Sequence, residues 1–301
     1  MNQLTSRTYE GEKDFQIIID GLKKFRPAKY ISDFPGQTDI EEKLAVEDIR
    51  ANTRLWFDGG QSIGWAYVDD FNNLHWEMDD QYTDLIGDEL VAWGDACIRK
   101  KLANGETATL DTNCREDYTA RISFLQRHGF QQTGDTNVAM TRSLFTPIPD
   151  PVLPQGFAIR PIKGVEEAEA VATMHRAAFG TEYMTTENRL IIMSTSGYDP
   201  TLDLLAIAPN GDIAAYCSCS VNNETKIGMT DPVATHPTYQ RLGLSRALLL
   251  TGMRLLKEGG MASAHLGTSG DNIAMQKTAE SVGFTIEHRT AWFSKTVTSK
   301  N

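Results

Sequence analysis

The spacing of apolar residues in the second half of the chain alternates between the period of a strand and that of a helix. This pattern predicts strands over residues 157–162, 203–208, 213–221, 226–235, 262–267 and 284–295, and helices over 164–179, 187–195, 243–258 and 272–282. The order indicates a mixed α/β domain, with more strands ahead of the helix 243–258 than a Rossmann unit contains.

The first half repeats part of this pattern. Strand-like runs joined by a short turn predict one hairpin over 55–67 and a second over 205–216. A helical stretch closes with Gly129-Phe130 in the first half and with Gly283-Phe284 in the second. Glycine is the usual left-handed residue after a helix. Because the matches keep one order at a nearly constant offset, we predict a duplicated domain.

A proline-rich segment separates the two halves. Four of the eleven prolines lie close together, at Pro147, Pro149, Pro151 and Pro154. Such a segment forms neither a helix nor a central strand, and is typical of a stiff, extended connector. We therefore predict a domain over 1–145, a linker over 146–155 and a second domain over 156–301.

Charge is distributed unevenly between the halves. Residues 1–150 carry 16 Lys and Arg against 26 Asp and Glu, whereas residues 151–301 carry 13 against 14. The net charge of -11 argues against a nucleic-acid-binding protein. The four cysteines form no CxxC pair, and no apolar run is long enough to span a membrane. We expect a reduced, cytoplasmic protein that binds neither nucleic acid nor membrane, and the scattered histidines indicate no metal site.

The segment Val233–Ser245 is the strongest candidate for chemistry. A β-branched strand ends before Pro237, and a turn with small residues at Gly243 and Ser245 leads into the next helix. Backbone N–H groups at a helix start converge on an anion, and Arg241 supplies a cation, so a pyrophosphate site is one interpretation. An ordinary helix start near solvent is the other. The GxxxxGKS/T, GxGxxG, HExxH and GxSxG motifs are absent.

Residues Gln240-Arg241-Leu242-Gly243-Leu244-Ser245 resemble the Q/R-x-x-G-x-G/A loop of the GNAT superfamily of acyl-CoA-dependent N-acyltransferases. The order of elements agrees, with Asn272 at the start of the last helix and Gly283-Phe284 at its end. The resemblance covers about 156–296, and 1–145 only in outline. It implies an α/β fold of two tandem GNAT-like domains, each a mixed, mostly antiparallel sheet flanked by helices, with a degenerate N-terminal copy.

The resemblance also implies acetyl-CoA as the donor substrate. Backbone groups of Val233 and Thr235 would pair with the pantetheine arm as an added strand does. A backbone N–H beside Val233 or Ala234 would stabilise the oxyanion. Asn272 would contact the arm or tie the last helix to the neighbouring strand. The pyrophosphate would be held by the amides of Gln240, Arg241, Leu242, Gly243, Leu244 and Ser245.

Asp231 is the first candidate for the general base. The resemblance implies that the strands part here, with Asp231 facing the gap, and Pro232 is consistent with this because a proline inside a strand indicates an edge or a bulge. A bulge Asp bonded to nearby backbone is an equal alternative. Glu182 is the second candidate, or else a solvent-facing charge. Ala279 lies where many family members carry the tyrosine that protonates the thiolate. Tyr183 or Tyr216 can substitute, or both are packed aromatics.

The matching helix start in the first half is crowded with carboxylates, at Asp79, Asp80, Asp84, Asp88 and Glu89, and only Gly87 is small. These carboxylates already interact with the positive end of the helix dipole, and their negative charge would repel a pyrophosphate. We expect this half to bind no acyl-CoA and to act as a scaffold that shapes the acceptor site.

The predicted function is acetyl transfer from acetyl-CoA to a primary amine of a small molecule or peptide, by direct attack in a ternary complex. One alternative is a non-catalytic acyl-CoA sensor or assembly protein. Another is a different tandem-GNAT reaction, such as aminoacyl transfer or mycothiol-type synthesis.

Overall fold

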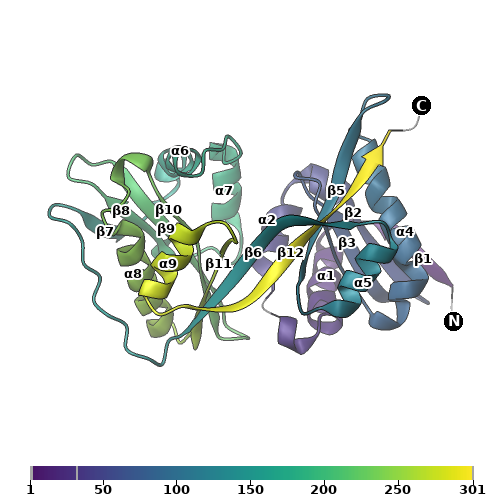
Figure 1. Ribbon diagram of the computed structural model, residues 1–301, viewed down its shortest axis with the longest axis horizontal. Helices are drawn as coiled ribbons and strands as arrows, with labels where there is room; N and C mark the ends of the chain where they lie inside the picture. Colours follow the sequence, from purple (N-terminus) through teal and green to yellow (C-terminus); the bar gives the residue numbers. More distant parts are fainter. Residues whose placement is uncertain (1–2, 32, 300–301) are drawn as a thin grey trace. The chain divides into compact units, whose positions relative to one another are not determined.

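The computed structural model describes residues 3–31 and 33–299, and the chain divides into two compact units (Figure 1). Unit 1 comprises residues 1–136 and 290–301, and unit 2 comprises residues 137–289. Within the described residues, no helix is long and apolar enough to cross a membrane.

These units differ from the predicted boundaries at both ends of the second domain. Strand β12 (Thr285–Thr298) pairs with β5 (Thr107–Arg115) from Thr290 onward, so the end of the chain belongs to unit 1. The proline-rich segment 146–155 is extended, and it packs on unit 2 through Ile148 and Leu153. Composition predicts the extended backbone of this segment but cannot show which surface it covers.

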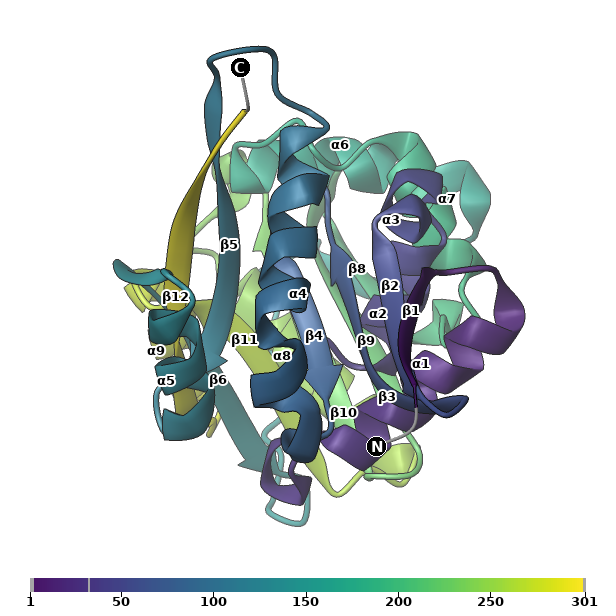
Figure 2. The same ribbon diagram turned by 90° about the vertical axis from the view of Figure 1, so that its right-hand side faces the viewer.

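Unit 1 is built on a four-stranded antiparallel sheet in the order β1-β2-β3-β4. Trp65 and Tyr67 of β3 face the core under α1, α2 and α3, whereas Ala66 and Val68 face the core of α4 and α5. Figure 2 views unit 1 from the α4 side. The remaining bounds are β1 Leu4–Thr8, α1 Glu12–Phe25, α2 Gln37–Leu44, α3 Glu47–Ala51, β2 Thr53–Asp58, β3 Gln61–Val68, β4 Leu74–Met78, α4 Asp80–Arg99 and α5 Thr119–Arg127.

Unit 2 contains the sheet order β6-β11-β10-β9-β8-β7, to which β6 (Gln131–Ser143) contributes residues 137–143. Its strands pair antiparallel, except that β10 and β11 run parallel. The other elements are β7 Ala158–Pro161, α6 Ala168–Phe179, α7 Thr186–Ser194, β8 Asp203–Ile207, β9 Ile213–Asn222, β10 Ile227–Thr235, α8 Leu244–Glu258, β11 Ser263–Ser269 and α9 Ile273–Ser281. The apolar pattern thus predicted the strands β7 to β11 and the helices α6 to α9 to within a few residues, whereas β6 was not predicted.

The two faces of strand β9 differ in chemistry. Cys217 and Cys219 point toward α8, where a Cβ on Gly252 would lie 2.7 Å from Cys219 Sγ. Both thiols are buried, and their sulfur atoms are 3.6 Å apart. Tyr216 alternates with them and points to the opposite face, where it meets α6. Helix α8 packs closely on one face of β9. The polar side chain of Tyr216 therefore lies on the other face, which α6 covers.

Candidate active site

Strands β10 and β11 pair over only three residues and then separate. Ile227–Met229 run parallel to Ser263–His265, while β10 continues to Thr235 along β9 alone. A β-bulge between Thr230 and Val233 shifts the register with β9, which confirms the irregularity predicted from Pro232. Proline cannot donate to a ladder, so its position fits the point at which regular pairing ends.

The separated part of β10 has an unpaired backbone edge. His236 N donates to Ala214 O of β9 at 2.9 Å. Because backbone groups alternate along a strand, Ala234 also faces β9, and the N–H and C=O groups of Val233 and Thr235 face the β11 side. An extended ligand can therefore pair with β10 at these two residues, which is the geometry implied for the pantetheine arm.

The loop Gln240–Ser245 joins this edge to the start of α8. Arg241 and Gly243 have left-handed backbone, with φ of 63° and 80°. Apart from Gly243 and its two chain neighbours, no described atom lies within 4 Å of a Cβ placed on Gly243, so the front of the loop is open. Helix α8 begins at Leu244, and its first backbone bond runs from Ala247 N to Gly243 O. The preceding amides have no partner within the helix, and the macrodipole adds positive potential there.

Thr235 and Ser245 fix the loop to the strand. Their hydroxyl oxygens are 2.7 Å apart, so the end of β10 and the first turn of α8 are held together. Gln240, Arg241 and Leu242 are exposed, whereas Leu244 is buried in the core. The loop therefore presents backbone and an arginine side chain to solvent, while its far end is anchored.

Asp231 lies in the bulge, on the side of β10 that faces β11. A Cβ on Gly267 of β11 would be 3.4 Å from Asp231 Oδ2. Asp231 is exposed, and its charge is one of the causes that raise the pKa of Tyr216, after burial. The structure thus brings Asp231 to the separation of the strands, beside the open edge of Val233.

Glu182 and Tyr183 lie in the loop between α6 and α7, after Gly180 ends α6 with a φ of 64°. The Glu182 side chain is almost fully exposed, with Oε2 3.9 Å from Arg176 Nε. Tyr183 is 37% exposed, and its carbonyl accepts a hydrogen bond from Asn188 Nδ2. The exposure of Glu182 agrees with a solvent-facing charge. A catalytic role for either residue stays a prediction.

Asn272 caps helix α9, because its side-chain oxygen accepts from Met275 N at 3.1 Å. The link between α9 and the end of β11 is made instead by Gln276, a residue that was not predicted from the sequence. Its Nε2 donates to Ser269 O and to Gly270 O, and the residue is buried. The signal available in the sequence was its spacing: Gln276 lies three positions before Ala279, so both residues are on the same face of the helix. Ala279 is fully buried and contributes only a methyl group.

In unit 1 the matching strand edge is filled by the chain itself. Asn73, just before β4, forms an isolated parallel bridge with Asp111 of β5. Beyond it, Arg121 of α5 donates from Nη2 to Trp76 O and lies 4.0 Å from the Trp76 ring centroid. The same guanidinium is 3.4 Å from Glu77 Oε2. A side chain thus occupies a carbonyl of β4 that an added strand would need.

The start of α4 is filled in the same way. Asp79 is the N-cap, and its carboxylate accepts from Gln81 N at 3.1 Å. Gly87 serves packing, because a Cβ there would lie 2.6 Å from the Phe124 ring and 2.9 Å from His128 Nε2. Its small size therefore allows α5 to approach α4, and it does not mark a phosphate loop.

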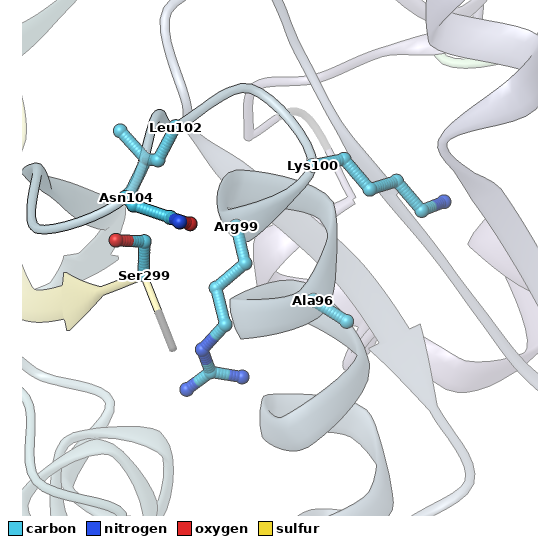
Figure 3. A pocket seen from close by; sticks show the side chains of 6 residues that line it. All are labelled: Ala96, Arg99, Lys100, Leu102, Asn104 and Ser299. Carbon is cyan, nitrogen blue, oxygen red and sulfur yellow. The ribbon is translucent and has the colours of Figure 1, made fainter. Parts of the chain in front are cut away.

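A separate pocket lies at the other end of α4, also in unit 1 (Figure 3). Its lining residues are Ala96, Arg99, Lys100, Leu102, Asn104 and Ser299. Arg99 donates to Asp95 Oδ2 and to Thr298 O, so its charge is used within the unit. Among the described residues, no group of three or more His, Cys, Asp or Glu is arranged to hold a metal ion.

Comparison with known proteins agrees with the fold. Residues 168–284 match the Acetyltransferase (GNAT) family, a span that includes β10, the 240–245 loop, α8 and α9. The chain therefore contains a GNAT acetyltransferase domain, and the matched residues lie in unit 2.

Two solved structures cover almost the whole chain. One is a GCN5-related N-acetyltransferase from Sphaerobacter thermophilus, with a TM-score of 0.72, 18% identity, and coverage of 99% of this chain and 97% of that one. The other is a tandem GNAT protein from the clavulanic acid biosynthesis pathway, with a TM-score of 0.74, 14% identity and 99% coverage of both chains. These similarities confirm the predicted tandem fold.

Curated relatives are named mycothiol acetyltransferases. The protein of Nocardia farcinica is 28% identical over 204 residues, which are 65% of this chain and 67% of the relative. That of Kineococcus radiotolerans is 33% identical over 139 residues, or 44% of each chain. The chain thus spans less than half the length of several relatives that it matches.

Proposed function

We propose that unit 2 is an acetyltransferase that uses acetyl-CoA to acetylate a primary amine of a small molecule or peptide. The observation that carries this proposal is the continuity of two features: the open edge of β10 at Val233 and Thr235, and the backbone loop Gln240–Ser245 at the start of α8. Together they suit a ligand with an extended amide-bearing arm and a pyrophosphate, which is the chemistry of CoA.

Each part of the donor has a partner in this arrangement. The two amide groups of pantetheine pair with the backbone of Val233 and Thr235. The pyrophosphate accepts hydrogen bonds from the amides of the loop Gln240–Ser245, and Arg241 adds a positive charge. The left-handed φ of Gly243 and the open space in front of it support close approach of the phosphates. Asn272 has its oxygen in the helix cap, which leaves its amide nitrogen for the arm.

Asp231 is the proposed base. It removes a proton from the acceptor ammonium, directly or through a water molecule, before the amine attacks the thioester carbonyl. The tetrahedral oxyanion accepts from the backbone N–H of Val233, which faces the separation of the strands. As the carbonyl re-forms, the C–S bond breaks and the thiolate leaves with the electron pair, while the nitrogen loses its second proton to water.

The thiolate proton is proposed to come from water or from Tyr183. Ala279 supplies no proton, and burial raises the pKa of Tyr216 while its hydroxyl is bonded to His175. Since a thiol has an ordinary pKa of about 8.5, thiolate departure needs only modest help.

Four free, buried cysteines support a protein that works in the reducing cytoplasm.

The experiment that tests this function follows release of free CoA thiol with a panel of primary amines. Steady release with at least one amine, together with a mass increase of one acetyl group on that amine, is expected. Binding of acetyl-CoA without turnover on any amine would overturn the catalytic proposal and favour an acyl-CoA sensor. The sensor is the second candidate because Ala279 replaces the tyrosine that donates a proton in many family members. The names of the curated relatives make amines of mycothiol chemistry a reasonable first set.

A further inference from the structure

His175 and Tyr216 form a hydrogen-bonded pair beside the proposed reaction centre. Tyr216 lies on β9 directly opposite Ala234, one residue from the Val233 amide. Its hydroxyl is 2.6 Å from His175 Nδ1 on α6. Tyr216 is 1% exposed, whereas His175 is partly exposed next to Phe179, with ring centroids 4.5 Å apart. The pair therefore connects the buried sheet to the exposed side of α6.

The hydrogen-bond balance fixes which nitrogen of His175 carries the proton. Within the described residues, Tyr216 Oη has His175 Nδ1 as its one hydrogen-bond partner. A buried hydroxyl hydrogen without an acceptor would cost free energy, so the Tyr216 O–H donates and Nδ1 accepts. In a neutral ring the proton must then be on Nε2. That nitrogen has no protein partner in the described part of the chain, which leaves it as a hydrogen-bond donor.

The surroundings keep the ring neutral. Burial first, and then the charges of Arg189 and Arg176, lower the pKa of His175 to about 4. Arg189 is itself paired with Asp203 of β8, and Arg176 lies 3.9 Å from Glu182. Besides burial, the negative charge of Asp231 raises the pKa of Tyr216. At neutral pH the pair therefore presents a fixed N–H donor and no extra charge.

From this geometry we infer that His175 is a specificity-determining residue, whose Nε2–H binds a hydrogen-bond-accepting oxygen of the amine substrate. The inference rests on the proposed function. It narrows the substrate to an amine that carries a hydroxyl, carbonyl or similar oxygen near the nitrogen, so that the nitrogen faces Asp231 while the oxygen reaches α6. Tyr216 is a positioning residue, since it acts through His175.

The first test is independent of catalysis. Long-range ¹H–¹⁵N spectra of the full chain report the tautomer of His175, assigned by comparison with His175→Gln. At pH 7 we expect a neutral ring with the proton on Nε2. In Tyr216→Phe the ring should become a mixture of tautomers. A wild-type ring protonated on Nδ1, or a doubly protonated ring, overturns the inference even if the protein is an active acetyltransferase.

The second test uses two amines of nearly equal shape, 2-aminoethanol and propylamine. The His175 Nε2–H resonance should move on titration with 2-aminoethanol in the presence of CoA, and should stay in place with propylamine. Equal movement with both amines, or movement with neither, contradicts the inference. Lack of turnover alone would contradict the proposed function without touching this result.

Kinetics separate a binding role from a structural one. His175→Phe should raise the KM for the oxygen-bearing amine about three- to tenfold, with kcat and the Kd of CoA unchanged. His175→Gln should restore most of the loss, because its terminal amide N–H reaches close to the position of Nε2. Glu169→Gln, an exposed change on the same helix, is the matched control. A fall in kcat of the same size for every amine would indicate a structural role and overturn the inference.

Discussion

The two units end corresponding strands in opposite ways. In unit 2, Val233 and Thr235 turn backbone groups to an open edge, and Gly243 leaves the start of α8 uncovered. In unit 1, Arg121 takes the carbonyl of Trp76, and the carboxylate of Asp79 caps α4. Under the proposed function, this difference explains why unit 2 and not unit 1 would bind acyl-CoA: in unit 1 the strand end and the helix start are satisfied internally.

The glycines of the two units make the same point. Gly243 has a left-handed backbone with open space in front, whereas Gly87 lies within a helix against Phe124 and His128. A residue that is small for access and a residue that is small for packing are indistinguishable in the sequence. They require different substitutions to test them.

The largest expected effect is that of Gly243→Glu. A side chain at a φ of 80° is strained, and the new carboxylate projects into the proposed pyrophosphate position. We expect acetyl-CoA affinity to fall at least about 100-fold, which corresponds to about 2.7 kcal/mol, by isothermal titration calorimetry. Gly243→Ala is the matched control, because it has the backbone strain without the charge and should retain most of the affinity. Undiminished binding by Gly243→Glu would disprove the site assignment.

Asp231→Asn addresses the chemistry beside the same edge. Loss of the base should reduce kcat by about 100-fold or more and leave the Kd of CoA within a factor of about two. The comparison is made between pH 6 and 9 with the best amine substrate. Should kcat stay near wild type throughout that range, Asp231 is not the base, and Glu182→Gln becomes the next variant to measure.

Gln276→Leu tests how helix α9 is held to the end of β11. The change removes the buried donor that serves Ser269 O and Gly270 O, so unfolding free energy should fall by about 1–3 kcal/mol in urea denaturation. The exposed neighbour Lys277→Gln should have little effect. An unchanged midpoint for Gln276→Leu would show that α9 is not held to β11 by this side chain.

The smallest expected effect is a pH dependence of stability in unit 2. The pKa of His175 in the folded chain is about 4, so the unfolded chain takes up a proton first as the pH falls below about 6.5. The contribution of His175 to the free energy of unfolding is thus fully present above pH 6.5 and declines as the pH falls toward 4. Between pH 7.5 and 5, His175→Gln should lose less Tm than wild type. An equal loss would remove His175 as a cause of acid sensitivity.

The sequence predicted features that depend on neighbouring residues. Pro232 predicted the bulge because proline lacks an N–H, and the small residues around Gly243 predicted the open loop before α8. Contacts between distant residues were not predictable in this way. Nothing local to Arg121 indicates that it reaches Trp76, and nothing local to Gln276 indicates that it binds the end of β11. The return of 290–301 to unit 1 likewise depends on pairing with β5, about 180 residues earlier in the chain.

The central claim is that one chain holds one acyl-CoA site, in unit 2. The most direct measurement is the stoichiometry of acetyl-CoA binding to the full chain by isothermal titration calorimetry, with wild type and Gly243→Glu side by side. The account predicts one molecule per wild-type chain and none for the variant. Two molecules per wild-type chain would show that unit 1 also binds acyl-CoA. One molecule still bound to Gly243→Glu would show that the site is not at the loop Gln240–Ser245. Either result would contradict the central claim.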